Sequence, residues 1–132
     1  TETVIKYLIK KYNLSDKNYI LILQATSPLR EKKDVEKIIR IAKKYNLNTL
    51  HSVNIYPNKK KIFGKKKFIS YNKKELSFNN DYSYNGAIYL FKLKYFKKNN
   101  SIYEKTPNLY IMKDVHSLDI DNYVDLKKLK KK

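Results

Sequence analysis

Two patterns of apolar residues divide the first half of the chain into predicted helices and strands. Residues 2–12 carry apolar side chains every three or four positions, which predicts an amphipathic helix. Residues 19–23 are instead a continuous apolar run, which favours a strand buried on both faces of a parallel sheet. A second helical pattern covers residues 32–45, and residues 49–55 form another predicted strand. This strand–helix–strand order is typical of a right-handed βαβ unit in a doubly wound α/β fold.

The middle of the chain is less regular. Residues 56–84 combine many lysines and aromatic residues with little periodicity, and short strands at residues 61–63 and 68–71 would form a hairpin arm. Asn85-Gly86 is a turn signal in front of a strong predicted strand at residues 87–91.

Three further elements complete a single predicted domain. A short helix is expected near residues 93–98, a strand at residues 109–112 and a last helix from about residue 122. The apolar side of that last helix consists of Tyr123, Leu126 and Leu129. A chain of 132 residues suffices for one hydrophobic core and is too short for two.

Composition limits the class of protein. Hydrophobic residues make up 42% of the chain, as in ordinary globular domains, and there is no cysteine for a disulfide or a thiolate metal site. No apolar run approaches the roughly 20 residues of a membrane helix, so we expect a cytoplasmic protein that does not bind membranes. The chain opens at Thr1 in a helical pattern, and we therefore expect the natural N-terminus to be missing.

The net charge of +18 suggests a nucleic-acid partner at first sight. The basic residues include only two arginines, Arg30 and Arg40, whereas nucleic-acid readers favour the planar, bidentate arginine side chain. The lysines are spread over every segment, and Lys, Asn, Ile and Tyr share A- or T-rich codons. A solvated basic surface is the favoured interpretation, and a lysine-rich nucleic-acid-binding module is kept as the alternative.

Gln24 is the first candidate for a ligand-binding residue. It follows the predicted strand at residues 19–23 and precedes a loop centred on Ser27-Pro28. In open α/β sheets the ligand crevice lies at the carboxyl ends of the strands, where the Gln24 amide can donate and accept hydrogen bonds. Alternatively, Gln24 satisfies backbone groups in the turn. If the strand at residues 87–91 runs antiparallel to its neighbours, Asn85 faces the same crevice.

Asp119 and Asp121 are the second candidates. On an extended segment, residues two apart project from the same face, so both carboxylates would converge. Mg²⁺ prefers such oxygen ligands and commonly bridges carboxylates to phosphates. The alternative is that Asp121 or Asn122 caps the last helix and Asp125 completes a turn like a capping box.

The two histidines give no chemical signal of their own. His51 and His116 have no partner at metal-ligand spacing, and we interpret both as ordinary strand or loop residues. With only two glycines, the chain has no P-loop and no dinucleotide-binding motif.

Three short motifs occur in one order along the chain. They read Leu-Ile-Leu-Gln-Ala-Thr-Ser-Pro-Leu-Arg at residues 21–30, Asn-Gly-Ala-Ile-Tyr at residues 85–89 and Ser-Leu-Asp-Ile-Asp at residues 117–121. They resemble the LLQPTSPLR, NGAIY and DID motifs of the acylneuraminate cytidylyltransferases, the CMP-sialic acid synthetases. The resemblance extends from Thr1 to the final helix.

The resemblance implies a fold and a reaction. The fold would be an α/β nucleotide-diphospho-sugar transferase, Rossmann-like with three α/β/α layers, and residues 56–84 would be the arm of a homodimer. The reaction would transfer CMP from CTP to the anomeric hydroxyl of a sialic-acid-like nine-carbon sugar and release pyrophosphate.

The resemblance also assigns residues. Asp119 and Asp121 match the aspartates that hold Mg²⁺ against the phosphates. Gln24 and Asn85 match sugar-contacting residues, and Tyr89 matches a residue that lines the acyl pocket.

The chain departs from the family pattern in three places. Ala25 replaces the usual proline, and the arginine-bearing stretch before NGAIY is replaced by residues 73–77, where Lys74 offers only a point charge for the sugar carboxylate. Pseudaminic, legionaminic and Kdo-type sugars are therefore alternative substrates. The family's nucleotide loop would precede Thr1, so residues 1–132 would be a single partial domain that is inactive alone.

Overall fold

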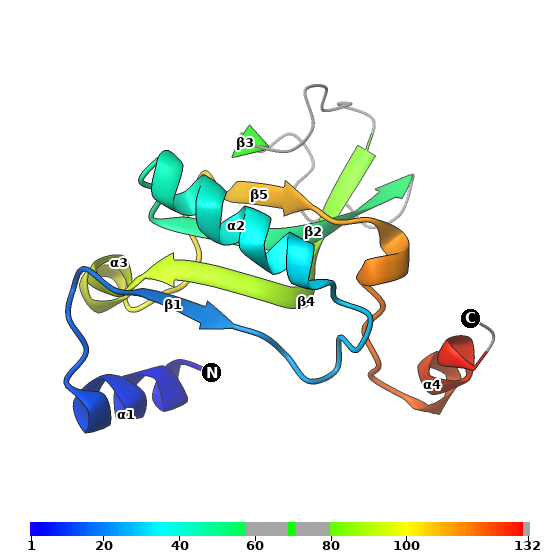
Figure 1. The fold of residues 1–132 in the computed structure, drawn as a ribbon, viewed down its shortest axis with the longest axis horizontal. Helices are drawn as coiled ribbons and strands as arrows, with labels where there is room; N and C mark the ends of the chain where they lie inside the picture. The colour runs from blue at the N-terminus through cyan, green and yellow to red at the C-terminus, as the bar shows by residue number, and fades with distance from the viewer. Residues whose placement is uncertain (58–68, 71–79, 131–132) are drawn as a thin grey trace.

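Five strands form one mixed sheet with helices on both of its faces (Figure 1). The computed structural model describes residues 1–57, 69–70 and 80–130. The strand order is β1-β4-β2-β5-β3. The elements, in chain order, are α1 (Glu2–Tyr12), β1 (Tyr19–Ile22), α2 (Lys32–Lys44), β2 (Thr49–Pro57), β3 (Ile69–Ser70), β4 (Asn80–Lys92), α3 (Leu93–Asn99), β5 (Asn108–Ile111), the 3-10 turn η1 (Asp114–His116) and α4 (Tyr123–Leu129).

The sheet is mixed, and the parallel sheet predicted around residues 19–23 is wrong in its pairing. β1 and β2 both pair antiparallel with β4, which lies between them, and β5 pairs parallel with β2. β1 and β2 therefore run in the same direction, as a βαβ unit requires, but they are not neighbours. An apolar run indicates that both faces of a strand are covered, but it does not indicate which strand lies beside it.

Helices cover both faces of β1, which explains its unbroken apolar run. Leu21 belongs to the apolar cluster under α2, whereas Ile20 and Ile22 pack on the opposite face with residues of α1 and α3. All four residues of β1 are only partly buried, because β1 is an edge strand of the described sheet. β1 is thus covered on both faces, as predicted, but its residues are not fully buried.

The core under α2 follows the predicted helical stripe. Ile38 and Ala42 are fully buried against Leu50 of β2 and Leu90 of β4. Asp34 stands one turn before Ile38 on the same face and is also buried. A carboxylate in an apolar stripe needs partners, and these lie at the candidate site below.

β4 is longer than predicted because Asn85-Gly86 is not a turn. The strand continues from Asn80 to Lys92, and its register with β2 shifts between the pairs His51–Tyr89 and Val53–Tyr84. Gly86 has a φ of 74°, a left-handed conformation that glycine adopts freely. The turn signal thus produces a bulge inside one strand, which bends the strand at the candidate site.

Parts of the predicted arm belong to the sheet. Residues 80–84 pair with β2, and Ile69–Ser70 pair with β5 in parallel. The predicted strand at residues 61–63 lies outside the described residues, and the arm's role in a dimer stays a prediction.

The last helix differs from its prediction. α4 begins one residue later than expected and lies away from the sheet (Figure 1). The apolar side predicted for it is not buried: Tyr123 is 68% exposed and Leu126 is 40% exposed. The apolar spacing was recognised, but no partner surface covers it within the described part of the chain.

None of the helices in the described ranges combines the length and the apolar character that crossing a bilayer requires.

Candidate functional site

The bulge of β4 is held by side chains instead of ladder hydrogen bonds. Oδ1 of Asn85 accepts hydrogen bonds from the Ser52 hydroxyl at 2.6 Å and from the Ala87 backbone N–H at 3.0 Å. The Asn85 amide nitrogen donates to Oδ1 of Asn54 at 2.9 Å, and Ser52 accepts from the Ile88 N–H at 2.8 Å. Buried backbone donors freed by the bulge thus regain partners, which fixes its shape.

Gly86 brings two of the predicted site residues together. A Cβ built on Gly86 would lie 2.3 Å from Oε1 of Gln24 and 3.7 Å from Oδ2 of Asp119. The amide of Gln24 therefore occupies the space that any other residue would take with its Cβ, and the carboxylate of Asp119 lies at van der Waals distance from the same point. This placement favours the crevice interpretation of Gln24 over a role in the Ser27-Pro28 turn.

Arg30 ties the loop of the first motif to the bulge. Its guanidinium group donates to the Gln24 carbonyl at 3.0 Å and to the Ala87 carbonyl at 2.8 Å. The backbone N–H of Ile120 also donates to the Thr26 carbonyl at 2.9 Å. One hydrogen bond thus joins the loop after β1 to the bulge of β4, one joins it to the segment with both aspartates, and the third closes the loop on itself.

A polar hollow of about 410 Å³ opens beside the bulge. We call it the polar hollow; it is lined by Asn54, Tyr84, Asn85, Ser117, Leu118, Asp119, Asp121, Asp125 and Lys128. Oδ1 of Asp119 is buried and has no hydrogen-bond partner among the described residues. A buried, unpaired carboxylate oxygen is costly unless a proton or a cation satisfies it, so this donor set fits a hard cation such as Mg²⁺.

Asn122, not Asp121, caps the last helix. The Asn122 side chain accepts from the N–H groups of Val124 and Asp125 at 2.9 and 3.1 Å. The Asp125 carboxylate accepts from the Asp121 N–H at 3.4 Å, and its other oxygen accepts from Lys128 at 2.7 Å. The capping alternative is therefore correct for Asn122, and the exposed carboxylate of Asp121 remains at the polar hollow.

A second hollow, of about 300 Å³, lies beside Gln24. We call it the aromatic hollow; it is lined by Thr1, Glu2, Ile22, Gln24, Tyr89, Ile102 and Tyr103. Burial, followed by the nearby Tyr103, raises the pKa of Tyr89 to about 12. The Tyr89 hydroxyl therefore stays protonated, and this hollow offers aromatic surface, neutral polar groups and the side chain of Glu2.

His51 lies behind the aromatic hollow. Its ring centroid is 5.1 Å from that of Tyr89 and 5.6 Å from that of Tyr103, and both contacts are edge-on. Nε2 of His51 lies 2.7 Å from the carbonyl oxygen of Ile102, so this nitrogen carries the proton. Burial lowers the pKa of His51 to about 4, which makes it a neutral residue of the core. Its interpretation as an ordinary strand residue is consistent with these contacts.

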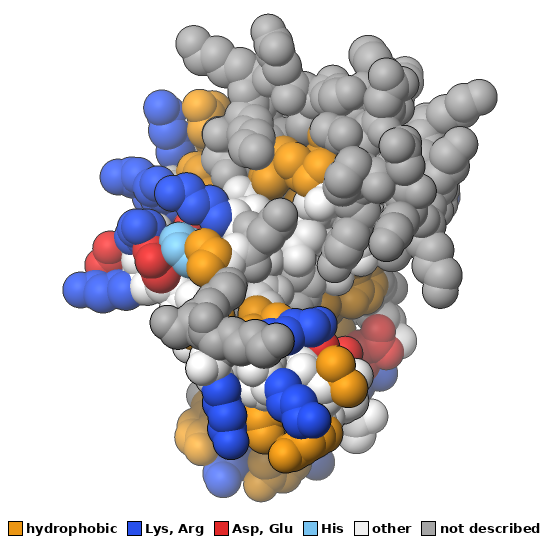
Figure 2. All heavy atoms as spheres, turned by 90° about the vertical axis from the view of Figure 1, so that its right-hand side faces the viewer, with side chains coloured by type: hydrophobic (Ala, Val, Ile, Leu, Met, Phe, Trp, Pro, Cys, Tyr) orange, Lys and Arg blue, Asp and Glu red, His pale blue; other side chains and the backbone are white. Residues whose placement is uncertain are grey.

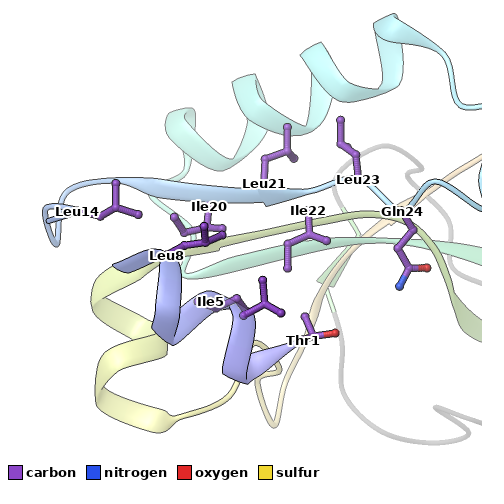
Figure 3. A pocket seen from close by; sticks show the side chains of 10 residues that line it. Thr1, Ile5, Leu8, Leu14, Ile20, Leu21, Ile22, Leu23 and Gln24 are labelled. Carbon is purple, nitrogen blue, oxygen red and sulfur yellow. The ribbon is translucent and has the colours of Figure 1, made fainter. Parts of the chain in front are cut away.

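An apolar groove adjoins Gln24 on the side of α1 (Figure 3). It has a volume of about 510 Å³ and is lined mainly by Val4, Ile5, Leu8, Leu14, Ile20 and Ile22. Figure 3 shows Leu21 and Leu23 on the side of β1 that faces α2, with the Gln24 amide on the opposite side. The alternation of the strand thus continues to Gln24 and sets the direction of its side chain.

The structure places the predicted site residues that it describes on two hollows. Asn85, Asp119 and Asp121 line the polar hollow, and Gln24 and Tyr89 line the aromatic hollow. β4 runs antiparallel to its neighbours, which is the condition under which Asn85 was expected near Gln24. Lys74 lies outside the described residues.

Sequence reasoning missed a group of polar residues on the α2 side. His116 contacts Glu31 and Asp34, and Asp34 accepts a hydrogen bond from the Tyr110 hydroxyl at 2.8 Å. One signal was available, because Asp34, Ile38 and Ala42 recur at a spacing of four along the buried stripe of α2. His116 gave no signal, since its partners are distant in sequence.

The positive charge does not gather in a single strip on the face drawn in Figure 2. Lysine and arginine side chains stand there in several separate places, with acidic side chains among them. This distribution agrees with a solvated basic surface for the described part of that face.

Comparison with models of known protein families gives no match, and comparison with curated protein sequences gives none either.

Proposed function

We propose that the chain carries the sugar-binding and metal-binding part of a cytidylyltransferase active site. In the reaction, the anomeric hydroxyl of an acidic nine-carbon sugar attacks the α-phosphorus of CTP. A new phosphorus–oxygen bond forms, the bond from the α-phosphorus to the bridging oxygen breaks, pyrophosphate leaves and the hydroxyl proton is released.

The observation that carries this proposal is the meeting of all three motifs at Gly86. Gln24 comes from the first motif, Gly86 from the second and Asp119 from the third, and both side chains lie within 4 Å of one point above Gly86. Residues far apart in sequence thus converge beside a carboxylate that has an unpaired oxygen. Such convergence is typical of a binding site at the end of sheet strands.

Asp119 and Asp121 are the residues that would hold Mg²⁺. The buried, unpaired Oδ1 of Asp119 and the exposed carboxylate of Asp121 provide hard oxygen ligands on the polar hollow. When bound, the metal would offset the negative charge that develops on the transferred phosphoryl group.

The remaining residues would bind and orient the sugar. Gln24 presents an amide over Gly86, and Asn85 keeps the bulge in shape while its amide nitrogen can donate a second hydrogen bond. Tyr89 and Tyr103 form an aromatic wall against which an acyl group can pack. Sialic, pseudaminic, legionaminic and Kdo-type sugars share the carboxylate and the anomeric hydroxyl that this arrangement needs.

Pyrophosphate release tests the proposal. The protein, expressed in the longest reading frame that contains this chain, is incubated with CTP, Mg²⁺ and a panel of these four sugar classes. We expect CTP-dependent release with at least one sugar, and a loss of about 100-fold or more in the Asp119→Asn, Asp121→Asn double variant.

Asp16→Asn is the matched control, because Asp16 is an exposed acid paired with Lys97 and lines neither hollow. It should retain full activity. If a folded protein releases no pyrophosphate with any sugar, the proposal is wrong. Strong RNA binding that weakens steeply with salt would then favour the lysine-rich nucleic-acid-binding module.

A further inference from the structure

Three titratable side chains meet on the α2 side of the candidate site, outside both hollows. Oε1 of Glu31 lies 2.8 Å from Nε2 of His116, and Oδ2 of Asp34 lies 3.2 Å from Nδ1 of His116. Glu31 directly precedes α2, Asp34 is in its first turn and His116 ends η1. We call these three residues the clamp, because they join segments 82 residues apart in sequence.

Each ring nitrogen of His116 faces one carboxylate oxygen at hydrogen-bond distance. An ionised carboxylate has no hydrogen to give, so it pairs with a ring nitrogen only as an acceptor. An imidazolium ring, which has a proton on each nitrogen, can donate to both carboxylates at once through charge-assisted hydrogen bonds, which are stronger than neutral ones.

Both carboxylates also have donors other than His116. The Tyr110 hydroxyl donates to Oδ1 of Asp34 at 2.8 Å, and burial together with this bond raises the pKa of Tyr110, so it remains a donor. Lys33 pairs with Glu31 at 2.5 Å, and this hydrogen bond is the main cause of the lowered pKa of Glu31, to which His116 and Lys113 also contribute. Asp34 is 6% exposed, so loss of His116 would leave a buried charge without its counter-ion.

A metal ion fits this geometry poorly. The three residues offer ligand atoms within 4.8 Å of one another, as a metal site would. However, the two nitrogens of an imidazole ring point in diverging directions, so an ion on one nitrogen faces only one of the two carboxylates. Lys33 and Lys113 add positive charge beside Glu31, which disfavours a further cation.

The clamp stands next to the segment that carries both site aspartates. His116 is followed directly by residues 117–121, which belong to neither a helix nor a strand. Ile120 of this segment donates to the Thr26 carbonyl, and Arg30, the neighbour of Glu31, binds the carbonyls of Gln24 and Ala87. The segment thus lies along the loop that leads into the clamp.

We propose that the clamp positions the site aspartates. The ion pairs of His116 with Glu31 and Asp34 fix residues 117–121 against the loop 24–30 and so hold the Asp119 carboxylate over Gly86. The tether itself does not depend on any activity, and only its effect on metal binding by Asp119 and Asp121 rests on the proposed function.

The charge state of His116 is measured first, by ¹⁵N NMR of the histidine rings in the whole chain at neutral pH. We expect the pattern of a doubly protonated ring for His116 and of a neutral ring for His51, which serves as the internal reference. A neutral ring at His116 overturns the clamp.

Amide hydrogen exchange then tests the tether. In His116→Gln and Asp34→Asn, we expect exchange in residues 117–121 to be faster by about tenfold, with unchanged protection in β4. Val115→Ala is the matched control, because its side chain is 43% exposed in the same turn, and it should leave exchange unchanged. Should either variant unfold, Glu31→Gln alters a part-exposed side chain and takes its place. Unchanged exchange in the folded variants overturns the proposal.

Metal titration separates the clamp from the proposed function. Mn²⁺ added to the wild-type chain should broaden the signals of Asp119 and Asp121, with affinity about fivefold weaker in His116→Gln and unchanged in Val115→Ala. No Mn²⁺ binding by the wild type contradicts the proposed function and leaves the exchange test intact. Zn²⁺ that binds at His116 and removes a ring proton overturns the clamp in favour of a metal site.

Discussion

The aromatic hollow and the polar hollow have different linings, and the histidine near each has a different set of neighbours. His51 packs on the tyrosines of the aromatic hollow, where burial lowers its pKa to about 4 and keeps it neutral. His116 stands before the segment that lines the polar hollow, with a carboxylate at each ring nitrogen. The sequence offered the same interpretation for both.

The difference shows what decides the charge of a histidine. Around His51 the neighbours are rings and a backbone carbonyl, so nothing offsets the cost of desolvating a cation. Around His116 two carboxylates supply that compensation. The surroundings of His51 therefore favour an uncharged ring, whereas those of His116 favour a charged one.

We expect acid to cause the largest loss of stability, because it protonates His51. The pKa of His51 falls from 6.5 when unfolded to about 4 when folded, so the unfolded chain takes up the proton first. Stability is therefore complete above the unfolded pKa and declines as the pH falls towards about 4, by on the order of 3 kcal/mol. Urea unfolding at several pH values measures this loss.

His51→Gln is the control for the acid experiment. It removes the titrating group, so its stability should fall less over the same pH range. Equal losses in both proteins would mean that His51 is accessible to protons in the folded state, and the contrast with His116 would disappear.

Arg30→Met should loosen the contact between the loop after β1 and the bulge of β4. The substitution removes the hydrogen bonds to the carbonyls of Gln24 and Ala87, at a cost of about 2 kcal/mol. Chemical denaturation measures the cost, and Arg40→Met, which changes an exposed arginine of α2, should cost little. Similar stabilities of the two variants would show that Arg30 does not join the loop to the bulge.

Gly86→Ala should disrupt the site at which Gln24 and Asp119 approach Gly86. Its left-handed φ of 74° costs alanine about 1–2 kcal/mol, and the new Cβ must displace the end of the Gln24 side chain. Gly86→Asn has the same Cβ but tolerates this φ better, so thermal unfolding should place it between alanine and wild type. Pyrophosphate release should be low in both variants, and full activity in either would show that Gln24 is not needed above Gly86.

Asp119→Asn should have the smallest effect on stability, and it should stabilise the protein, whereas the changes above destabilise it. It removes the charge from a buried, unpaired oxygen, so thermal unfolding without metal should show a gain of up to about 1 kcal/mol. Asp121→Asn, at an exposed position, should change stability little. Both variants should lose the stabilisation that Mn²⁺ gives the wild type. A destabilised Asp119→Asn would indicate that protein groups already compensate the carboxylate.

The local elements could be predicted because short-range pattern determines them. The helix at residues 2–12 agrees with α1, the helix at residues 32–45 ends one residue later than α2, and the strand at residues 49–55 is extended by two residues in β2. Each is marked by its own apolar spacing and flanking polar residues.

The pairing of the strands could not be predicted in the same way. β4 lies between β1 and β2, and its bulge replaces the turn expected at Asn85-Gly86. A glycine beside an asparagine allows positive φ in a turn and in a bulge alike. Whether the chain reverses or continues there depends on β2, whose Ser52 and Asn54 bind Asn85.

For this protein the sequence by itself determined the helices, most of the strands and the three motifs that contain Gln24, Asn85 and Asp119. Only the tertiary structure decided that these motifs meet at Gly86 and that His116 joins Glu31 and Asp34. The physical reason is the distance along the chain over which each effect acts. Apolar spacing and capping depend on a few neighbouring residues, whereas the role of a charge or an unpaired oxygen depends on residues that folding brings from far along the chain.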